Sequence, residues 1–482
     1  MARWTLLLLC TVACSVARTP ETTAPTEAAP PPAVASAQTE PAPATSRWLA
    51  PVVESAAWLD HVATRAPAGL SWRGDLLDET SVDPLHLADG TAGVIYLYLG
   101  LSRATGAARY REDAVKAAAQ LLAELDARGP LPRATSFYYG LGGVAFVLHE
   151  LSVETGDPRY DDAARALLAK VKGMAVRRRG KVRFHENHPE LLFGDAGTIL
   201  FLEWAARVLG DPAAHEMSLE AAESLVQDAI VMKGNRLDWS MRRDKEILLP
   251  NFTHGAAGIG YVMASLDSPP LLTVARKAGN YLDSVAVVDD LGYRLPYGWP
   301  LDEWEGRFDL GYAHGPAGAA RYFVRMWQVT GEDDYRQKAI ACATAIVASG
   351  APEEPHSGFG PEPFDPSYRF GLASALELLV EIHRMTGAPR LRETAEAIAA
   401  ALLERSVVED GRRHWPTTRP AYVERPGEPA AYTGFFQGTA GYAVALLRLV
   451  ELDHDARYLA QLPDYPFGGD ADEATRTPAP AG

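Results

Sequence analysis

The sequence predicts an all-α protein in which seven pairs of helices close into a ring. The first observation is a local pattern that occurs seven times, in which Gly-x-x-Gly opens an apolar run; Ser374 replaces the second glycine of the sixth copy. The second is the spacing of 50 to 67 residues between the lead glycines, which fits two helices and their loops. The third is that the first and last runs are as apolar as the middle ones, whereas an open solenoid needs polar capping repeats. The lead glycines are Gly90, Gly140, Gly194, Gly255, Gly315, Gly371 and Gly438.

Each repeat is expected to begin with a buried inner helix and to continue with a half-exposed outer helix. The run after Gly90 (VIYLYLGL) is apolar on nearly all sides, which is typical of a helix packed between neighbours. A pair such as Thr105-Gly106 follows most of these runs, and glycine after an apolar helix is a C-cap signal. The next segment is amphipathic, with Val115 and Leu122 on one face. Because no alternating pattern separates these segments, we expect no strands between the helices.

The N-terminus predicts export. Met-Ala-Arg is followed by an uncharged apolar run to Ala17, which is too short for a membrane span and fits a signal peptide. The segment Thr11-Val12-Ala13-Cys14 resembles the bacterial lipoprotein box, although leucine is usual where Thr11 stands. We therefore interpret residues 1–14 as a signal peptide with a lipidated Cys14. The alternative is ordinary cleavage nearby, with loss of Cys14.

Two terminal segments are expected to be disordered, and the folded body is placed at residues 47–467. Residues 15–46 are rich in Pro, Ala, Thr and Ser, and they cannot bury enough apolar surface to fold. Their prolines keep the chain extended, so this segment would act as a tether. Residues 468–482 form a similar tail. Together these features predict a bacterial lipoprotein anchored to a membrane, in the periplasm or at the cell surface.

Charge and cysteine content exclude several kinds of partner and site. The net charge of −16, from 62 acidic and 46 basic side chains, disfavours a nucleic-acid partner or an anionic membrane surface. The basic run from Arg177 to Arg183 is interpreted as a solvated loop between helices. Two of the three cysteines lie in the first 14 residues, which excludes a disulfide framework and a Cys-rich zinc site in the body. Cys342 lies in an apolar helix, where a small core residue is expected.

A ring of seven Gly-x-x-Gly repeats of this length resembles the lanthionine synthetase C-like (LanC-like) family, and the likeness covers nearly the whole body. The resemblance implies a double-layered α/α toroid with about seven inner and seven outer helices. It also implies peptide modification, in which a cysteine thiol adds to dehydroalanine or dehydrobutyrine. In that family a zinc ion in the toroid mouth binds the thiol. The zinc deprotonates this thiol, whose pKa is otherwise about 8.5.

The zinc ligands that the resemblance implies are missing from this chain. The family has a cysteine two residues before the fifth lead glycine and a Cys-His pair before the sixth. Here these positions hold Ala313, Arg369 and Phe370. Alanine and phenylalanine have no ligating atom, and arginine brings a positive charge that repels a cation. We therefore expect a degenerate member of the family, a pseudoenzyme with neither zinc nor another cofactor.

The same resemblance implies further residues of the mouth. His254 stands at the acid/base position of the family, directly before the fourth lead glycine, and His314 has this position in the fifth repeat. Asp89, Tyr139 and Gln437 precede other lead glycines and are candidates for binding a ligand. Two alternatives stay open for the histidines. They could hydrogen-bond backbone groups at the helix starts, or they could share a metal for which no third ligand is evident.

Three functions stay open from the sequence. The first is a tethered, zinc-less protein that binds a peptide or a small molecule. The second is a LanC-like thiol-addition enzyme that works without zinc. The third is a carbohydrate-active α/α toroid of the six-hairpin glycosidase kind, whose chemistry needs carboxylates, or a carboxylate and a histidine, at a cleft. Its candidate residues are Asp302, Glu303, Glu305 and Asp309, beside Trp299 and Trp304.

Overall fold

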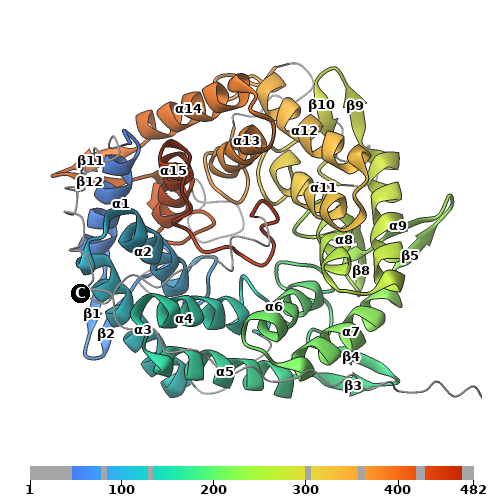
Figure 1. Cartoon of the computed structure of the whole chain (residues 1–482), viewed down its shortest axis with the longest axis horizontal. Coiled ribbons are helices and arrows are strands. Elements are labelled where there is room, and N and C mark those ends of the chain that lie inside the picture. Colours follow the sequence, from blue (N-terminus) through green and yellow to red (C-terminus); the bar gives the residue numbers. More distant parts are fainter. Residues whose placement is uncertain are drawn as a thin grey trace, which may run out of the picture. The chain divides into compact units, whose positions relative to one another are not determined.

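The structure is a computed structural model that describes residues 46–76, 84–128, 134–298, 306–356, 364–418 and 429–468. The chain divides into two units, Met1–Ala44 and Thr45–Gly482, and the described residues belong to the second. In this unit the helices form two concentric layers (Figure 1). The inner layer contains α2 (Thr91–Thr105), α4 (Leu141–Thr155), α6 (Asp195–Val208), α8 (Ala256–Ser265), α11 (Pro316–Thr330), α13 (Leu372–Thr386) and α15 (Thr439–Asp453). The outer layer contains α1 (Leu49–Val62), α3 (Ala108–Arg128), α5 (Pro158–Gly173), α7 (Pro212–Val226), α9 (Pro269–Val285), α12 (Asp333–Ala348) and α14 (Pro389–Glu404).

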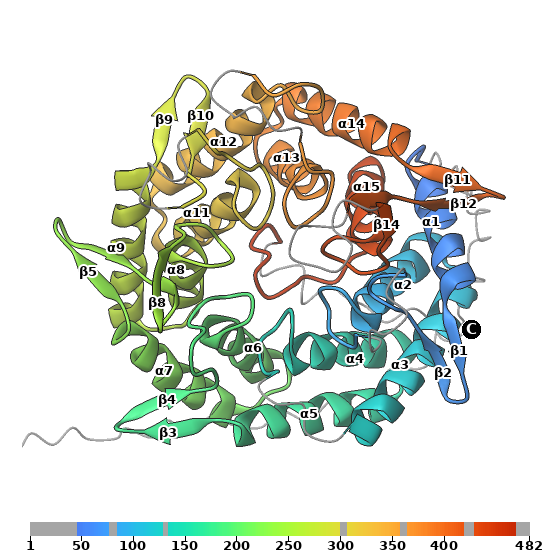
Figure 2. The ribbon, with the colours of Figure 1, turned by 180° about the vertical axis from the view of Figure 1, so that it is seen from behind.

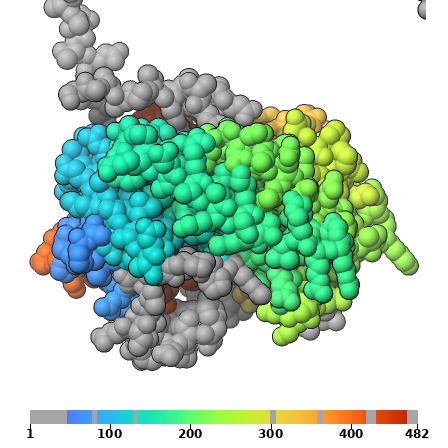
Figure 3. Space-filling view, turned by 90° about the horizontal axis from the view of Figure 1, so that it is seen from below, coloured from blue at the N-terminus to red at the C-terminus, as the bar shows by residue number. Residues whose placement is uncertain are grey.

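The predicted double-layered α/α toroid is confirmed, with seven inner and seven outer helices in the described part of the chain. Each inner helix begins directly after a lead glycine, and four of them end at a glycine in the left-handed conformation, with φ between 66° and 71°. Figure 3 shows the side of the ring where residues coloured from cyan to green, the range of α3, α5 and α7, form a continuous outer wall. Within the described residues, no helix combines the length and the apolar character that spanning a bilayer requires.

The first helix of the chain completes the outer layer beside the last one. α1 packs against α15, and the Ser46 hydroxyl donates to the Asp453 carboxylate over 2.7 Å. On the other side, Arg413 in β12 (Arg412–His414) forms an ion pair with Glu54 at 2.8 Å. Helix α1, at the start of the folded body, is therefore the outer partner of α15, the seventh inner helix. This arrangement ties the two ends of the repeated region together (Figure 2).

The loops before the inner helices are hydrogen-bonded into a continuous ring, which confirms that the repeats close. At six of the seven junctions, the residue two positions before the lead glycine hydrogen-bonds its counterpart in the next repeat. At the seventh junction, between the second and third repeats, Ser136 stands four positions before its lead glycine, and its hydroxyl donates to the Leu192 carbonyl oxygen over 3.1 Å. The other contacts join an amide nitrogen to a carbonyl oxygen: Phe436 to Ala88 (2.8 Å), Ala88 to Tyr138 (3.1 Å), Leu192 to Thr253 (3.3 Å), Thr253 to Ala313 (3.3 Å), Ala313 to Arg369 (2.7 Å) and Arg369 to Phe436 (2.9 Å).

Crowding in this ring explains the lead glycines. A Cβ atom at Gly255 would lie 1.7 Å from the carbonyl oxygen of Leu249, so no other residue fits without moving the backbone. The sixth repeat has Ser374 instead of its second glycine. The Ser374 hydroxyl accepts a hydrogen bond from the Tyr312 amide at 2.8 Å, which ties the sixth repeat to the fifth.

The expectation that no strands occur was wrong. The described residues contain seven two-stranded antiparallel hairpins, and the predicted loop from Arg177 to Arg183 is one of them. Its turn holds Arg179 and Gly180 at φ values of 53° and 75°, as a two-residue hairpin turn requires. Strands of three or four residues are too short to give a visible alternation. The hairpins are β1 (Thr64–Ala66) with β2 (Gly69–Ser71), β3 (Val176–Arg178) with β4 (Lys181–Arg183), β5 (Ile230–Met232) with β6 (Arg236–Asp238), β7 (Ser240–Arg242) with β8 (Lys245–Leu248), β9 (Val287–Asp289) with β10 (Gly292–Arg294), β11 (Val407–Glu409) with β12, and β13 (Pro416–Thr418) with β14 (Pro429–Ala431).

The segment after α15 runs through the space that the inner helices enclose (Figures 1 and 2). Its Asp464 is fully buried and accepts hydrogen bonds from the hydroxyls of Tyr138 and Tyr312, at 2.9 and 2.6 Å. Its backbone carbonyls accept hydrogen bonds from Tyr96 on α2 and Tyr261 on α8. Residues 455–468 therefore join several repeats along the axis of the ring.

Candidate functional site

The loops that precede the seven lead glycines lie together at the end of the ring where the inner helices begin. We call this end the mouth. The ring of hydrogen bonds described above holds these loops next to one another, so side chains that are far apart in sequence become neighbours. The site residues predicted from the sequence should therefore lie in the mouth.

His254 is held by a carboxylate. Its side chain is buried, and its Nδ1 atom lies 2.9 Å from Oε2 of Glu190, which is itself fully buried. The Glu190 carboxylate also accepts hydrogen bonds from the amides of Leu192 and Phe193, at 2.9 and 2.8 Å. Because a carboxylate oxygen accepts hydrogen bonds, Nδ1 of His254 must carry a proton. In the neutral ring, Nε2 is then the nitrogen with a lone pair.

His314 lies next to His254, with the two ring centroids 5.4 Å apart. The His314 ring stacks on Tyr297 at 4.3 Å, and its Nδ1 atom lies 3.1 Å from Nδ2 of Asn251. The same amide nitrogen donates to the Tyr297 carbonyl at 2.7 Å, which fixes the orientation of the amide. Burial lowers the pKa of His314 well below its usual value, and the nearby charges of Arg369 and Arg307 lower it further. His314 is therefore neutral at pH 7, with its proton on Nε2.

The positions that match the zinc ligands of the family lie side by side. The Ala313 amide donates to the Arg369 carbonyl over 2.7 Å, and the Arg369 guanidinium lies 4.7 Å from the centre of the Phe370 ring. None of the three side chains offers a lone pair to a metal. In the described ranges, no group of three or more His, Cys, Asp or Glu side chains could hold a metal ion. The residues at these positions do not fit zinc.

Tyr139 joins two parts of the mouth. Its hydroxyl lies 3.4 Å from Nη1 of Arg369, and its ring packs on His86 and Phe193 with centroids 4.8 and 4.6 Å apart. Asp89 belongs to the same region, since its backbone amide donates to Nδ1 of His86 at 3.3 Å. The structure thus brings Tyr139 next to Arg369, one of the positions that match the zinc ligands of the family, and it brings the ring of His254 next to that of His314. Gln437 is partly exposed in the seventh loop.

Glu190 and Asn251 were missed from the sequence. Both stand four residues before a lead glycine, and three further loops carry a polar residue there, namely His86, Ser136 and Ser367. The polar residue four positions before the lead glycine is therefore a second repeated pattern that could have pointed to these site residues. The residue type alone did not show which polar side chains would reach a histidine of another repeat.

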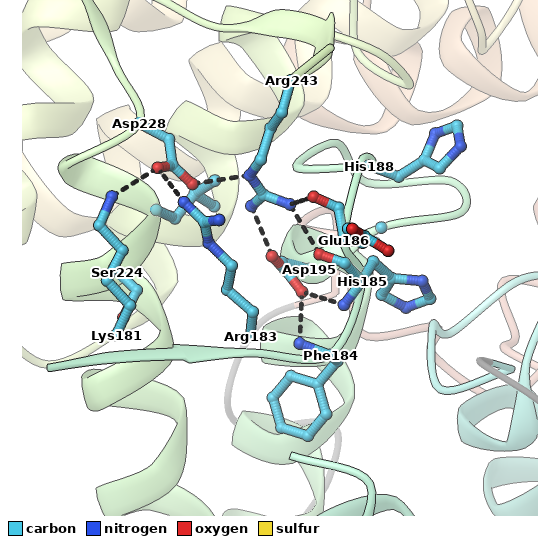
Figure 4. A network of polar contacts seen from close by, with 12 residues as sticks. Lys181, Arg183, Phe184, His185, Glu186, His188, Asp195, Ser224, Asp228 and Arg243 are labelled. Atoms are coloured by element: carbon cyan, nitrogen blue, oxygen red, sulfur yellow. Dashed lines mark hydrogen bonds and ion pairs between the residues drawn. The ribbon is translucent and has the colours of Figure 1, made fainter. Parts of the chain in front are cut away.

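Arg243 fixes the loop that leads to Glu190 (Figure 4). It forms ion pairs with Asp195 and Asp228, and its Nη1 atom donates to the His185 carbonyl oxygen over 2.8 Å. The Asp195 carboxylate in turn accepts hydrogen bonds from the amides of Phe184 and His185. Residues 184–188 are therefore held from both sides directly before Glu190, the partner of His254.

Of the remaining residues singled out from the sequence, the structure describes some and not others. Asp302, Glu303, Glu305, Trp299 and Trp304, the candidates for carbohydrate chemistry, lie outside the described residues, as does Cys14. Asp309 is described, and burial raises its pKa to about 6, opposed by Arg307 at 3.7 Å. Cys342 is fully buried, as expected for a core residue, and burial raises the pKa of its thiol.

Comparison with known proteins gives one family. The model of the family described as "Lanthionine synthetase C-like protein" matches residues 81–462. No curated protein matches the chain. Among solved structures, nisin cyclase superposes with a TM-score of 0.57 at 14% identity, covering 80% of this chain and 93% of the cyclase. An unsaturated glucuronyl hydrolase specific for heparin gives a TM-score of 0.47 at 12% identity, covering 86% of this chain and 99% of the hydrolase.

Proposed function

The chain belongs to the lanthionine synthetase C-like family, and we propose that it is a zinc-less member that binds a peptide or small molecule in the mouth of its toroid. The observation that carries this proposal is the contact between the fifth and sixth loops. It places Ala313, Arg369 and Phe370 together at the positions that match the zinc ligands of the family. Without a metal, a thiol of a bound peptide keeps a pKa of about 8.5, and little of it is the attacking thiolate at pH 7.

The histidines support a role in binding. His254 is oriented by Glu190, and neutral His314 is oriented by Asn251, so each ring has one nitrogen fixed by the protein and one left for a ligand. Tyr139 adds a hydroxyl, and Phe193 and Phe370 add apolar surface. A mouth with oriented polar groups on aromatic walls is typical of a small-molecule or peptide site.

One observation favours a second candidate function, thiol addition without zinc. Arg369 puts a positive charge where the family has its metal, and a neighbouring cation lowers the pKa of a thiol. On this reading Arg369 would stabilise the thiolate in place of zinc. His254 would move the proton.

A thiol-addition assay separates the two candidates. The purified protein should not accelerate the addition of a cysteine thiol to dehydroalanine in a linear peptide carrying both groups. Mass spectrometry after thiol alkylation distinguishes the cyclised product, because cyclisation removes the free thiol. If cyclisation exceeds the protein-free rate and falls in Arg369→Gln, the protein is a zinc-independent enzyme and the binding proposal is wrong. The exposed hairpin variant Arg178→Gln is the control.

We also propose that the protein is exported and held at a bacterial membrane through lipidated Cys14, with residues 15–46 as the tether. The full-length protein should sediment with membranes of a bacterial host, because an acyl anchor adds apolar surface that water excludes. Cys14→Ser should release the protein or block its processing. Equal membrane partition of the wild type and the variant would contradict an anchor at Cys14.

A further inference from the structure

Arg369 carries a charge that has no carboxylate partner among the described residues. Its Nη1 atom makes one long hydrogen bond of 3.4 Å to the Tyr139 hydroxyl, and its guanidinium lies over the Phe370 ring. Its Nε atom is buried and has no hydrogen-bond partner. Among the described residues, no carboxylate lies within 4.0 Å of this guanidinium. A partly buried guanidinium with unused donors is costly, so this site is prepared for an anion from outside.

Two carboxylates of the mouth, Glu190 and Asp309, and a second arginine, Arg307, already have partners. Glu190 holds His254 and two backbone amides, and Asp309 lies 3.7 Å from Arg307. The Arg307 guanidinium also covers the Tyr297 ring at 3.7 Å. Arg369 therefore has no ion-pair partner among these groups.

From these contacts we propose that Arg369, assisted by Tyr139, binds the C-terminal carboxylate of a peptide in the toroid mouth. The inference rests on the proposed function, because it names the group by which the ligand is held. A guanidinium is planar and donates charged hydrogen bonds that match a carboxylate, and Nη1 of Arg369 already points to Tyr139. A phosphate carries more charge and would need a second cation, whereas the charge of Arg307 is balanced by Asp309.

The side chains around Arg369 indicate which kind of residue precedes the C-terminal carboxylate in the bound peptide. Tyr139, Phe193, Phe370 and His314 present ring faces or edges next to one another, with centroid distances of 4.6 Å between Tyr139 and Phe193 and 6.1 Å between His314 and Phe370. An apolar or aromatic side chain of the ligand can pack on these rings. We therefore expect a peptide whose last residues include an aromatic side chain.

Calorimetric titration with two matched probes tests the inference. The probes are an N-acetylated Ala-Phe-Ala tripeptide with a free C-terminal carboxylate and the same tripeptide with a C-terminal amide. The acid should bind at least about ten times more tightly than the amide, as charged hydrogen bonds allow. Arg369→Gln should remove this preference, and Arg369→Lys should keep part of it, because lysine retains the charge without the planar guanidinium. Arg178→Gln, on the exposed tip of a hairpin, should bind like the wild type.

A third probe and a stability measurement make the outcomes distinct. Glucuronate supplies a carboxylate on a sugar; if it binds through Arg369 and the peptide acid does not, the peptide assignment is overturned. Equal binding of acid and amide, or no binding of any probe at 1 mM, also overturns the inference. Arg369→Gln should unfold at an equal or higher temperature than the wild type, since it removes a charge that has no carboxylate partner in the described ranges, and a marked fall would mean that Arg369 is structural. Stoichiometric zinc in the same preparation would instead contradict the proposed function.

Discussion

Exchange of Glu377 for glutamine should lower the free energy of unfolding by about 3–5 kcal/mol. Glu377 on α13 forms ion pairs with Arg321 on α11 and with Arg448 on α15, and each of the three side chains is only 2% exposed. Its carboxylate also accepts a hydrogen bond from the Tyr368 hydroxyl at 2.7 Å. Glutamine keeps the shape but leaves two buried guanidinium groups short of negative charge. The loss should be large because both charges stay buried at the centre of the ring.

Urea-induced unfolding followed by circular dichroism measures this effect. The matched control is Glu396→Gln on the outer helix α14, where the carboxylate pairs with Arg392 and Arg47 at a more exposed position. Surface ion pairs contribute little, so the control should stay close to the wild type. Equal effects of the two substitutions would show that the central ion pairs do not stabilise the toroid.

Exchange of Arg243 for methionine should cost about 3 kcal/mol at neutral pH. Methionine keeps much of the apolar stem but removes the counter-charge of Asp195, which is 2% exposed. Burial already raises the pKa of Asp195, and Arg243 opposes this shift. Without Arg243 the pKa of Asp195 rises further. The folded state then holds this proton to higher pH than the unfolded state, so its stability falls as the pH rises through that window.

The neighbouring Arg242→Met is the control for this substitution, because Arg242 forms its ion pair with the exposed Asp244 in the same hairpin. Thermal unfolding at several pH values compares the two variants. The deficit of Arg243→Met should shrink towards acid pH, where Asp195 is protonated in both the folded and the unfolded state. A deficit that does not depend on pH would mean that Arg243 stabilises the loop by packing alone.

The fold was predictable because its signal recurs. Seven Gly-x-x-Gly patterns and the glycines after the apolar runs located the inner helices, and the crowding at Gly255 shows why glycine is needed. The hairpins were missed because strands of three or four residues cannot show a period. The placement of α1 beside α15 was also missed, since nothing in a linear pattern says that the first helix completes the last pair.

The candidate site was predictable only in part. His254 and His314 could be predicted because each stands directly before a lead glycine, and the structure brings their rings together. Their partners Glu190 and Asn251 lie 64 and 63 residues away from them in sequence, and only the closed ring makes them neighbours. The sequence likewise did not show that Arg369 lacks a carboxylate partner within the described ranges, because this depends on which carboxylates lie near it in the fold. Sequence patterns show positions, whereas pairing depends on three-dimensional proximity.

Metal analysis of the purified protein and of one triple variant tests the zinc-less account most directly. The wild type, prepared without a metal-binding tag, should contain well below one zinc per chain. The variant Ala313→Cys, Arg369→Cys and Phe370→His restores the ligand types of the family at positions that the structure holds side by side. It should bind about one zinc or cobalt, with the absorption bands of tetrahedral thiolate–cobalt. Stoichiometric zinc in the wild type would contradict the account, and so would a normally folded triple variant that binds no metal.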